Sequence, residues 1–418
     1  MKKYQLLLLL FFCTKIITAQ TPELIPFLKG DKYGYANNKR EIKIPINYEQ
    51  ASLFSEGLAE IKLNGKIGFI DKTGKIIITP TYENAYNFSE GFAAVMLDSK
   101  WGYINKTGKV VMPIIYESCG SFKNGLANVK LNNKYGLIDI KGNIILPIEY
   151  RYIYEFSEEM ARVEKDKKHG YVNKLGKLVV PPEEREGFEF SEGLAAIKMS
   201  SGYWGFVDKA GKVIIEGNYH DAYMFKEELA RVSRYVKYSK KYGFIDKVGK
   251  EVIPSIYDDV SEFSEGLARV STEVKSYYTD KYGVKKEQMN LGNRPIQSGY
   301  IDKKGKEVIP IQFESYGGNF KEGMARVKVN GKYGFIDKTG KLIIPAIYDS
   351  NEDFNEGLAL VYKGKGFGFV YGFVDKTGKE VIPLKYKECY SFKNGLATVY
   401  IKNKYCYIDK KGTQYWED

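Results

Sequence analysis

Residues 66–99 read KIGFIDKTGKIIITPTYENAYNFSEGFAAVMLDS, and this pattern recurs along the chain. Ten copies can be aligned on a glycine that in most of them follows an aromatic residue: Gly34, Gly68, Gly102, Gly136, Gly170, Gly205, Gly243, Gly299, Gly334 and Gly372. Most copies are 34 or 35 residues apart, and an eleventh, incomplete copy has Cys406 in the glycine position. A fixed period in this range indicates a repeat array, in which each unit buries its apolar face only against its neighbours.

Each copy has the features of short β-strands. Residues 69–71 and 76–78 are rich in β-branched and aromatic side chains, and Gly74 lies between them where a hairpin needs a positive φ. We expect Pro80 to end the second strand, because proline cannot donate to a β-ladder. A third strand follows, and in some copies it meets the next through Asn-Gly, a strong hairpin signal. No copy shows a helical period with caps, so the sequence predicts an all-β array of short hairpins.

A Phe-Ser-Glu-Gly-Leu-Ala block joins one copy to the next, as at 54–59, 190–195 and 263–268. Its Phe and Leu are expected to fill the core between units. Glu159 and Glu228 replace the glycine in two copies. Either a positive φ is not obligatory there, or these two copies are locally strained.

The residue after the repeat glycine is aromatic in most copies. Tyrosine and phenylalanine alternate there, with tyrosine at Tyr35, Tyr103, Tyr171 and Tyr300. This alternation predicts that burial of the ring matters and that the hydroxyl does not.

The first residues have the pattern of a secretory signal peptide. Lys2 and Lys3 precede a short apolar run at 6–12, and Ala19 offers a small residue at the cleavage site. We expect residues 1–19 to be removed and 20–418 to form the array, in the periplasm or at the cell surface. The alternatives are a buried N-terminal strand and a lipoprotein with a lipidated Cys13. No stretch is long enough to predict a transmembrane span.

The net charge of +12 falls to +9 if Lys2, Lys3 and Lys15 are removed with the signal peptide. The remaining excess is dispersed among turn lysines, which more often keep a β-protein soluble than bind an acidic partner. The sequence therefore gives no basis for a nucleic-acid partner. Docking on phosphate-rich envelope glycolipids remains an alternative.

Three cysteines would remain after cleavage, so disulfides are not the framework of this fold. Cys119 and Cys389 occupy the same place in their copies, which favours a small buried slot. Cys389 and Cys406 lie in adjacent units and are the one pair that could bridge. The sequence leaves that pairing open.

No constellation of residues indicates catalysis. The two histidines, His169 and His220, fit as substitutions in the repeat pattern. An Asp or Asn follows the first strand of each copy, as at Asp71 and Asn105, and both residues can cap a turn by accepting backbone N–H bonds. Calcium at these turns is the alternative. Phosphate loops, Cys-x-x-Cys pairs and nucleophile elbows are missing, so we expect no enzyme activity, cofactor or metal.

These features together resemble the WG-containing repeat. Its marks are Trp or another aromatic before Gly, a Lys-x-Gly-Lys turn, an Ile-Pro and a Phe-x-Glu-Gly-Leu-Ala block. The Trp itself stands at Trp101 and Trp204, Tyr replaces it in most other copies, and Ile67, His169 and Ser298 depart from the pattern. The resemblance covers nearly all of the chain after the signal peptide. It implies a bacterial binding or scaffolding array with no single associated reaction.

The largest departure from the period is an insertion near 272–297. It holds the candidate ligand-binding residues Tyr277, Tyr278, Tyr282, Lys285 and Lys286, a mixture suited to a sugar, a glycolipid or a protein surface. A tolerated, disordered loop is the alternative. We expect a scaffold for a protein or cell-envelope partner. Carbohydrate or cell-wall binding through exposed tyrosines is the second hypothesis.

The ends of the array bear on its overall shape. The chain holds eleven hairpins but ten linking blocks, an inequality that an open stack explains directly. The sequence therefore favours an open or superhelical β-solenoid. A closed propeller-like ring is the alternative.

Overall fold

The computed structural model describes residues 21–183, 186–273, 277–279, 285–287, 296–314, 317–364, 368–401 and 403–417. The expected signal peptide, 1–19, lies outside the described residues. These residues form strands β1 to β42 and no helix. The prediction of an all-β array of short hairpins is confirmed.

Each unit is a meander of a first, a middle and a third strand. The first strands are β1 (Ile25–Lys29), β5 (Leu58–Leu63), β9 (Phe92–Leu97), β13 (Leu126–Leu131), β17 (Met160–Lys165), β20 (Leu194–Lys198), β24 (Leu229–Val236), β28 (Leu267–Glu273), β33 (Met324–Val329), β37 (Leu358–Lys363) and β40 (Leu396–Ile401). The middle strands are β2 (Lys32–Ala36), β6 (Lys66–Asp71), β10 (Lys100–Asn105), β14 (Lys134–Asp139), β18 (Lys168–Asn173), β21 (Trp204–Asp208), β25 (Ser239–Ile245), β31 (Ile296–Asp302), β34 (Lys332–Asp337), β38 (Val370–Asp375) and β41 (Lys404–Asp409).

The third strands are β3 (Ile42–Tyr48), β7 (Ile76–Tyr82), β11 (Val110–Tyr116), β15 (Ile144–Tyr150), β19 (Leu178–Glu183), β22 (Val213–Tyr219), β26 (Glu251–Tyr257), β32 (Glu307–Glu314), β35 (Leu342–Tyr348) and β39 (Glu380–Tyr386). A further strand often precedes the first strand on its open side: β4 (Gln50–Ala51), β8 (Asn84–Ala85), β12 (Ser118–Cys119), β16 (Tyr152–Ile153), β23 (Asp221–Lys226), β27 (Asp259–Val260) and β36 (Ser350–Asn351). The typical sheet therefore has the order β4-β5-β6-β7. We number the units one to eleven and call the block between two units the linking turn.

The hairpin between first and middle strands is regular. In the second unit β5 pairs with β6 from Leu58↔Asp71 to Leu63↔Lys66. Asn64 and Gly65 close it with φ values of 51° and 75°, the positive pair that a type I′ turn requires. The hairpin signal in the sequence is thus confirmed.

The pairing between middle and third strands contains a bulge. In the second unit Ile67 pairs with Tyr82 and Phe69 with Ile78, so residues 79–81 lie opposite Gly68 alone. The expectation that Pro80 ends the strand is wrong, because β7 continues to Tyr82. Proline is tolerated here because a bulge frees its nitrogen from the ladder. A Cβ on Gly68 would lie 2.6 Å from the Pro80 nitrogen, which explains the repeat glycine.

The core is divided among the contacts between successive units. One cluster joins Phe69 and Ile78 of the second unit to Phe88 of the linking turn and Val95 and Ile104 of the third unit. Phe88 is 2% exposed. In the block at 190–195 both residues are buried, Phe190 at 1% and Leu194 at 7% exposure, so the prediction that the Phe and Leu fill the core is confirmed for that block.

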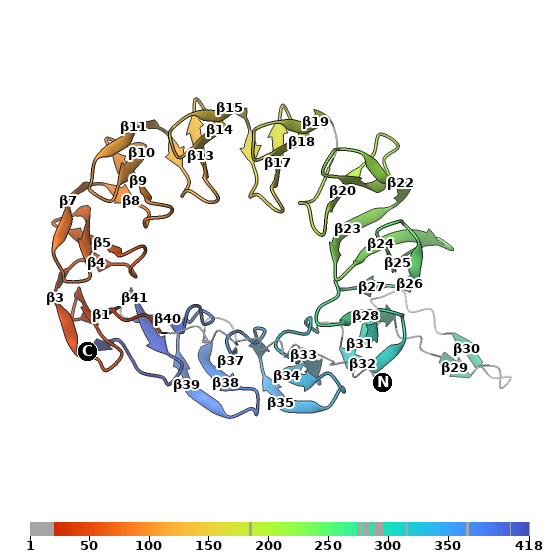
Figure 1. Ribbon diagram of the computed structural model, residues 1–418. Helices are drawn as coiled ribbons and strands as arrows, with labels where there is room; N and C mark the ends of the chain where they lie inside the picture. The colour runs from red at the N-terminus through yellow and green to blue at the C-terminus, as the bar shows by residue number, and fades with distance from the viewer. Residues whose placement is uncertain are drawn as a thin grey trace, which may run out of the picture.

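The units follow one another around a ring whose two ends meet (Figure 1). β42 (Trp416–Glu417) pairs in parallel with β1, and the Leu28 N–H donates to the Tyr415 carbonyl. One core cluster contains Leu24 and Leu28 together with Ile408 and Trp416. Of the two forms considered, the structure therefore has the closed ring, and the preference for an open array is corrected. The first strand of the first unit is β1, and no linking block precedes it. Eleven hairpins therefore need only ten linking blocks.

The three cysteines among the described residues are buried and free. Cys389 and Cys406 both pair with Val399, one on each side of β40. Two strand spacings therefore separate them, about 10 Å between Cα atoms. A disulfide needs a Cα separation of less than about 7 Å, so this backbone cannot bridge the pair.

Candidate functional site

The Asp or Asn that recurs at the end of the middle strand of each unit caps a turn. Asp71 Oδ1 accepts the backbone N–H groups of Thr73 at 2.9 Å and Lys75 at 3.1 Å. Asn105 makes the same two bonds in its own turn. The hydrogen bond from the Thr73 hydroxyl is the main cause that lowers the pKa of Asp71. The capping prediction is confirmed. Among the residues that the structure describes, His, Cys, Asp and Glu form no group of three that could hold a metal.

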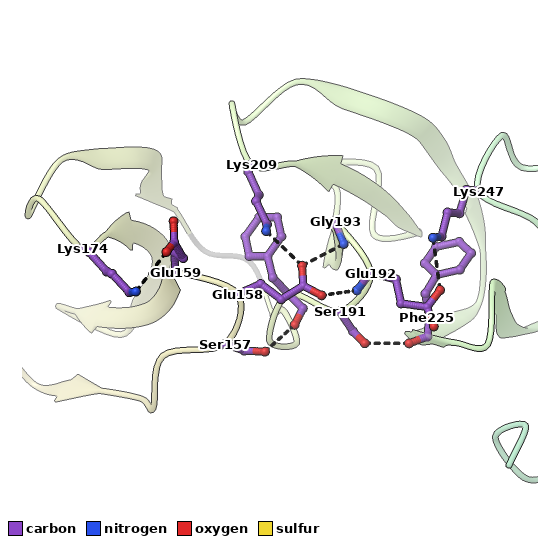
Figure 2. A network of polar contacts seen from close by, with 11 residues as sticks. Ser157, Glu158, Glu159, Lys174, Ser191, Glu192, Gly193, Lys209, Phe225 and Lys247 are labelled. Carbon is purple, nitrogen blue, oxygen red and sulfur yellow. Dashed lines mark hydrogen bonds and ion pairs between the residues drawn. The ribbon is translucent and has the colours of Figure 1, made fainter. Parts of the chain in front are cut away.

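The linking turns are tied to each other by a ladder of polar contacts, which Figure 2 shows between the fifth and seventh units. Ser157 Oγ donates to the Phe190 carbonyl at 2.7 Å. Glu158 accepts the N–H of Gly193 at 2.8 Å and binds Lys209 Nζ at 3.1 Å. Burial opposes ionisation of Glu158, but these contacts lower its pKa overall.

The same carboxylate contact recurs around the ring. A Glu of one linking turn accepts a backbone N–H of the next at Glu56, Glu90, Glu158, Glu192, Glu227, Glu265, Glu322 and Glu356. These carboxylates therefore act as inter-unit ties. Glu159 and Glu228 keep positive φ values of 72° and 74°, so the two copies that lack the turn glycine are locally strained.

The tyrosine hydroxyls after the repeat glycine also tie units together. Tyr103 Oη donates to the Gly120 carbonyl at 2.7 Å, and Tyr171 Oη donates to the Phe188 carbonyl at 2.6 Å. Tyr35 and Tyr300 make the equivalent bond. The expectation that the hydroxyl is dispensable is wrong for these units, because a buried donor must be paired.

The candidate residues of the insertion fall on a separate ribbon. β29 (Tyr277–Thr279) and β30 (Lys285–Glu287) pair antiparallel and place Tyr278 opposite Lys286. Tyr282 lies outside the described residues. The ribbon backbone thus brings Tyr277 and Tyr278 beside Lys285 and Lys286, and their role in binding stays a prediction.

A second candidate surface, which the sequence reasoning missed, follows the fourth to seventh units. We call it the aromatic row, and it consists of Tyr135, Tyr152, Tyr154, Arg162, Phe188, Trp204, Tyr223 and Arg231. Tyr152 contacts both Tyr135 and Tyr154, with ring centroids 6.2 and 6.5 Å apart. Phe188 stacks on Trp204 at 5.3 Å and contacts Tyr223 at 5.6 Å. Tyr152 is 48% exposed, so the row reaches the surface.

Two arginines hold the row in place. The Arg162 guanidinium lies 3.7 Å from the centre of the Tyr154 ring, and its Nη1 donates to the Gly187 carbonyl at 2.7 Å. Arg231 repeats this arrangement, 3.6 Å from the Tyr223 ring and bonded to the Val260 carbonyl. Each arginine therefore bridges two successive linking turns. The signal in the sequence was an Arg eight residues after a Tyr, at 154 and 162 and again at 223 and 231.

His169 lies at the edge of this surface, in the slot that Trp or Tyr fills elsewhere. Partial burial is the main cause that lowers its pKa, and the nearby Arg162 adds to the effect. His169 is therefore mostly uncharged near neutral pH. It pairs across the strands with Glu164, a buried carboxylate that binds Arg151 at 2.8 Å.

Comparison with known proteins gives a family. The model of the family described as "WG containing repeat" matches residues 33–66, 67–101, 101–135, 135–168, 170–203, 204–238, 242–273, 299–333, 333–366 and 371–405. No curated protein matches the chain.

Solved structures are similar only at a coarse level. The extracellular domain of a hybrid two-component system from B. thetaiotaomicron is 12% identical with a TM-score of 0.30, and the match covers 93% of this chain and 61% of that one. BamB from Moraxella catarrhalis is 8% identical with a TM-score of 0.27, covering 83% of this chain and 94% of that one. Likeness at this level says nothing about what this chain does. Within its described parts, the chain has no helix long and apolar enough to cross a membrane.

Proposed function

Because this chain belongs to the WG containing repeat family, we propose that it is an exported, non-catalytic bacterial scaffold that binds a protein or cell-envelope partner. The observation that carries the proposal is the aromatic row. Tyr, Trp and Arg are the residues that contribute most to binding energy at protein interfaces. Here such residues occur on four successive units, and Arg162 and Arg231 each pack on a tyrosine of the row.

The geometry of the row suits an extended partner. Its rings pack on one another and on Arg162 and Arg231, which donate to backbone carbonyls, so little side-chain entropy is lost when a partner binds. Tyr152 is exposed, and Tyr154, Phe188 and Tyr223 are half-buried, which leaves their faces or edges accessible. Phe188 connects two units through Trp204 and Tyr223. A partner that lies along the row would thus contact several units at once.

The export part of the proposal rests on the sequence of residues 1–19. The test is to produce the full chain with a C-terminal tag in a bacterium and to determine the N-terminal residue of the recovered protein by mass spectrometry. A chain that begins at Gln20 and is found outside the cytoplasm supports export. An uncleaved chain in the cytoplasm contradicts it.

The binding part is tested by photo-crosslinking from the row in the producing cells. The row variant carries Tyr152→Ser, Tyr154→Ser and Tyr223→Ser. The matched control carries Tyr203→Ser, Tyr235→Ser and Tyr238→Ser, three tyrosines outside the row that are 50%, 59% and 101% exposed. We expect a defined cross-linked partner that the control retains and the row variant loses at least tenfold. Equal recovery with both variants would exclude the row as the binding surface.

Carbohydrate binding is kept as the second candidate because of a pocket at the ring closure. Tyr33, Tyr400, Tyr405 and Tyr407 line a pocket of about 490 Å³ together with Glu49 and Lys404. Tyr405 is 53% exposed, and sugars stack on accessible aromatic rings. Binding of soluble cell-wall fragments that Tyr405→Ala abolishes would favour this function. Failure of such fragments to bind would remove it.

A further inference from the structure

Among the ten units that a linking turn follows, one lacks a contact that the others share. In nine units the aromatic residue after the repeat glycine packs on the Phe of the following linking turn. The ring pairs, with centroids 4.7 to 5.2 Å apart, are Tyr35–Phe54, Phe69–Phe88, Tyr103–Phe122, Tyr171–Phe190, Phe206–Phe225, Phe244–Phe263, Tyr300–Phe320, Phe335–Phe354 and Phe373–Phe392. In the fourth unit this position is Leu137, so Phe156 has no ring partner of this kind.

A pocket opens where that ring would lie. Its volume is about 360 Å³, and Leu137 and Phe156 both line it, with Phe122, Leu126 and Ala127 adding apolar walls. Phe156 is half-buried, whereas Phe122 and Phe190 of the neighbouring linking turns are 1% exposed. Leucine is smaller than the aromatic ring that other units have at this position, so it leaves space beside Phe156, as a large-to-small change in a core does.

The polar end of the pocket also has a counterpart in other units. Where the residue is tyrosine, its hydroxyl donates to the carbonyl of a residue 17 or 18 positions further on, as Tyr103 does to Gly120. The equivalent residue in the fourth unit is Tyr154, which lines the pocket. No described side chain donates to its carbonyl. The pocket thus combines an apolar space large enough for an aromatic ring with a hydrogen-bond acceptor, the Tyr154 carbonyl, at the position where other units bind a hydroxyl.

The pocket is open to ligands from outside. Lys123 and Glu155 line it, are 68% and 88% exposed, and form an ion pair at 3.2 Å. Both are long, exposed side chains, and such a pair contributes little stability, so it can part at low cost. Pockets of this size hold small ligands that are mainly apolar and are oriented by a few polar groups.

We propose that the pocket between the fourth and fifth units binds a phenolic ring, which stacks on Phe156 beside Leu137 and donates its hydroxyl to the Tyr154 carbonyl. The ring takes the place that a Tyr side chain of this chain occupies in other units. It comes either from a free phenol or from a tyrosine side chain of a bound partner. This proposal does not depend on binding at the aromatic row, although Tyr154 belongs to both sites.

The test is titration of the full chain with p-cresol, followed by NMR and thermal unfolding. We expect saturable binding in the millimolar range or tighter and a rise in Tm with ligand. Benzyl methyl ether and cyclohexanol, which lack either the phenol donor or the aromatic ring, should bind at least fivefold more weakly. Leu137→Phe and Leu137→Tyr should each raise Tm without ligand and weaken p-cresol binding at least tenfold.

Two further measurements distinguish a free phenol from a tyrosine side chain as the ligand and keep the proposal testable if the Leu137 variants misfold. Binding of N-acetyl-tyrosinamide comparable to that of p-cresol supports a tyrosine side chain, and binding of p-cresol alone supports a free phenol. Phe69→Leu should create a second p-cresol site in the second unit. The proposal is overturned if p-cresol does not bind saturably, or if folded Leu137→Phe binds it as tightly as the wild-type chain does.

Discussion

The backbone of each linking turn is left-handed at two successive residues, whatever side chains stand there. Glu56 and Gly57 have φ values of 51° and 90°, and the pair Glu227 and Glu228 has 51° and 74°. A Cβ added to Gly57 would meet no atom within 4 Å, so space does not select glycine. The selection comes from the cost of positive φ for residues that have a Cβ.

We expect Glu228→Gly to raise the free energy of unfolding by about 1 kcal/mol, because it removes that cost from a turn whose conformation is already set. The Glu228 backbone N–H, which donates to Glu192, is unaffected. Urea unfolding followed by tryptophan fluorescence measures the change. Gly57→Ala is the matched control and should lower stability by a similar amount. If Glu228→Gly is neutral or destabilising, the turn is not strained.

Glu60 is a half-buried carboxyl on β5 at a position that other units give to Ala, Asn, Arg, Leu or Thr. Burial raises its pKa from 4.5 to about 7. The folded chain therefore holds a proton that the unfolded chain loses above about pH 4.5. The contribution of Glu60 to stability is full below that pH, falls as the pH rises to about 7, and is lost above it.

The neutral variant Glu60→Gln should match the wild type in Tm at pH 4.5 and exceed it at pH 8. A pKa shift of this size corresponds to at most about 3 kcal/mol of stability. Comparing the two chains at each pH cancels the opposite trend from Glu56 and Glu158, whose pKa values are lowered. A constant difference in Tm across this range would show that Glu60 is solvated.

At the scale of the strand, the repeat glycine and the Ile-Pro pair depend on each other, because the bulge at the proline lies directly opposite the glycine. The bulge around Pro80 brings the third strand so close to β6 that a Cβ on Gly68 would lie 2.5 Å from the Ile78 carbonyl oxygen. In the eleventh unit β41 pairs with β40, and only an isolated bridge, Ile408↔Gln414, follows. Among the residues that the structure describes, no bulged third strand pairs with β41, so the described backbone does not require glycine at position 406.

Gly68→Ala should therefore destabilise the chain by several kcal/mol, because the backbone opposite must shift and the bulge must rearrange. Cys406→Ala, at the same repeat position but without the bulge, should cost about 1 kcal/mol or less. Chemical unfolding of the two variants tests the comparison. Similar losses for both would show that the bulge is not what requires glycine.

The strands and turns could be predicted because the interactions that specify them lie within about ten residues. Asn64-Gly65 specifies a type I′ hairpin, and Asp71 caps its own turn. The aromatic row and the Leu137 pocket depend on contacts between linking turns more than thirty residues apart, such as those between Phe188 and Tyr223. The replacement of an aromatic by Leu137 was visible in the sequence, but its consequence required knowing that Phe156 packs there.

Ring closure belongs to the whole molecule. Each unit is rotated slightly relative to the preceding one, and this angle decides whether the array closes. The hydrophobic pattern of a repeat does not specify the angle. Open and closed arrays can therefore have nearly the same repeat sequence. What distinguishes them is the fit between the ends. Here β1 lies between β2 and β42, and Arg40 donates to the Trp416 carbonyl at 3.0 Å.

The double variant Tyr415→Ala, Trp416→Ala should open the ring. Tyr415 is fully buried and Trp416 is 8% exposed, and both belong to core clusters with residues of the first unit, so truncation removes apolar contacts across the seam. The remaining seam is narrow, because β42 pairs with β1 at only two residues, Leu28 and Lys29. In small-angle X-ray scattering we expect a larger radius of gyration and maximum dimension than the wild type gives. For scale, a compact globular chain of this length has a radius of gyration of about 22 Å.

Tyr405→Ala is the control for this measurement, because Tyr405 lies at the same seam but is 53% exposed and meets Tyr33 through its backbone carbonyl. It should leave the scattering curve unchanged. Superimposable curves for the wild type and the double variant would mean that the other seam contacts, such as the Lys404 bond to the Asp31 carbonyl, suffice for closure. An opened ring would instead show that the last strand decides the shape of the array. The seam pocket should then lose Tyr33, which β2 contributes, so glycan binding there should fail together with closure.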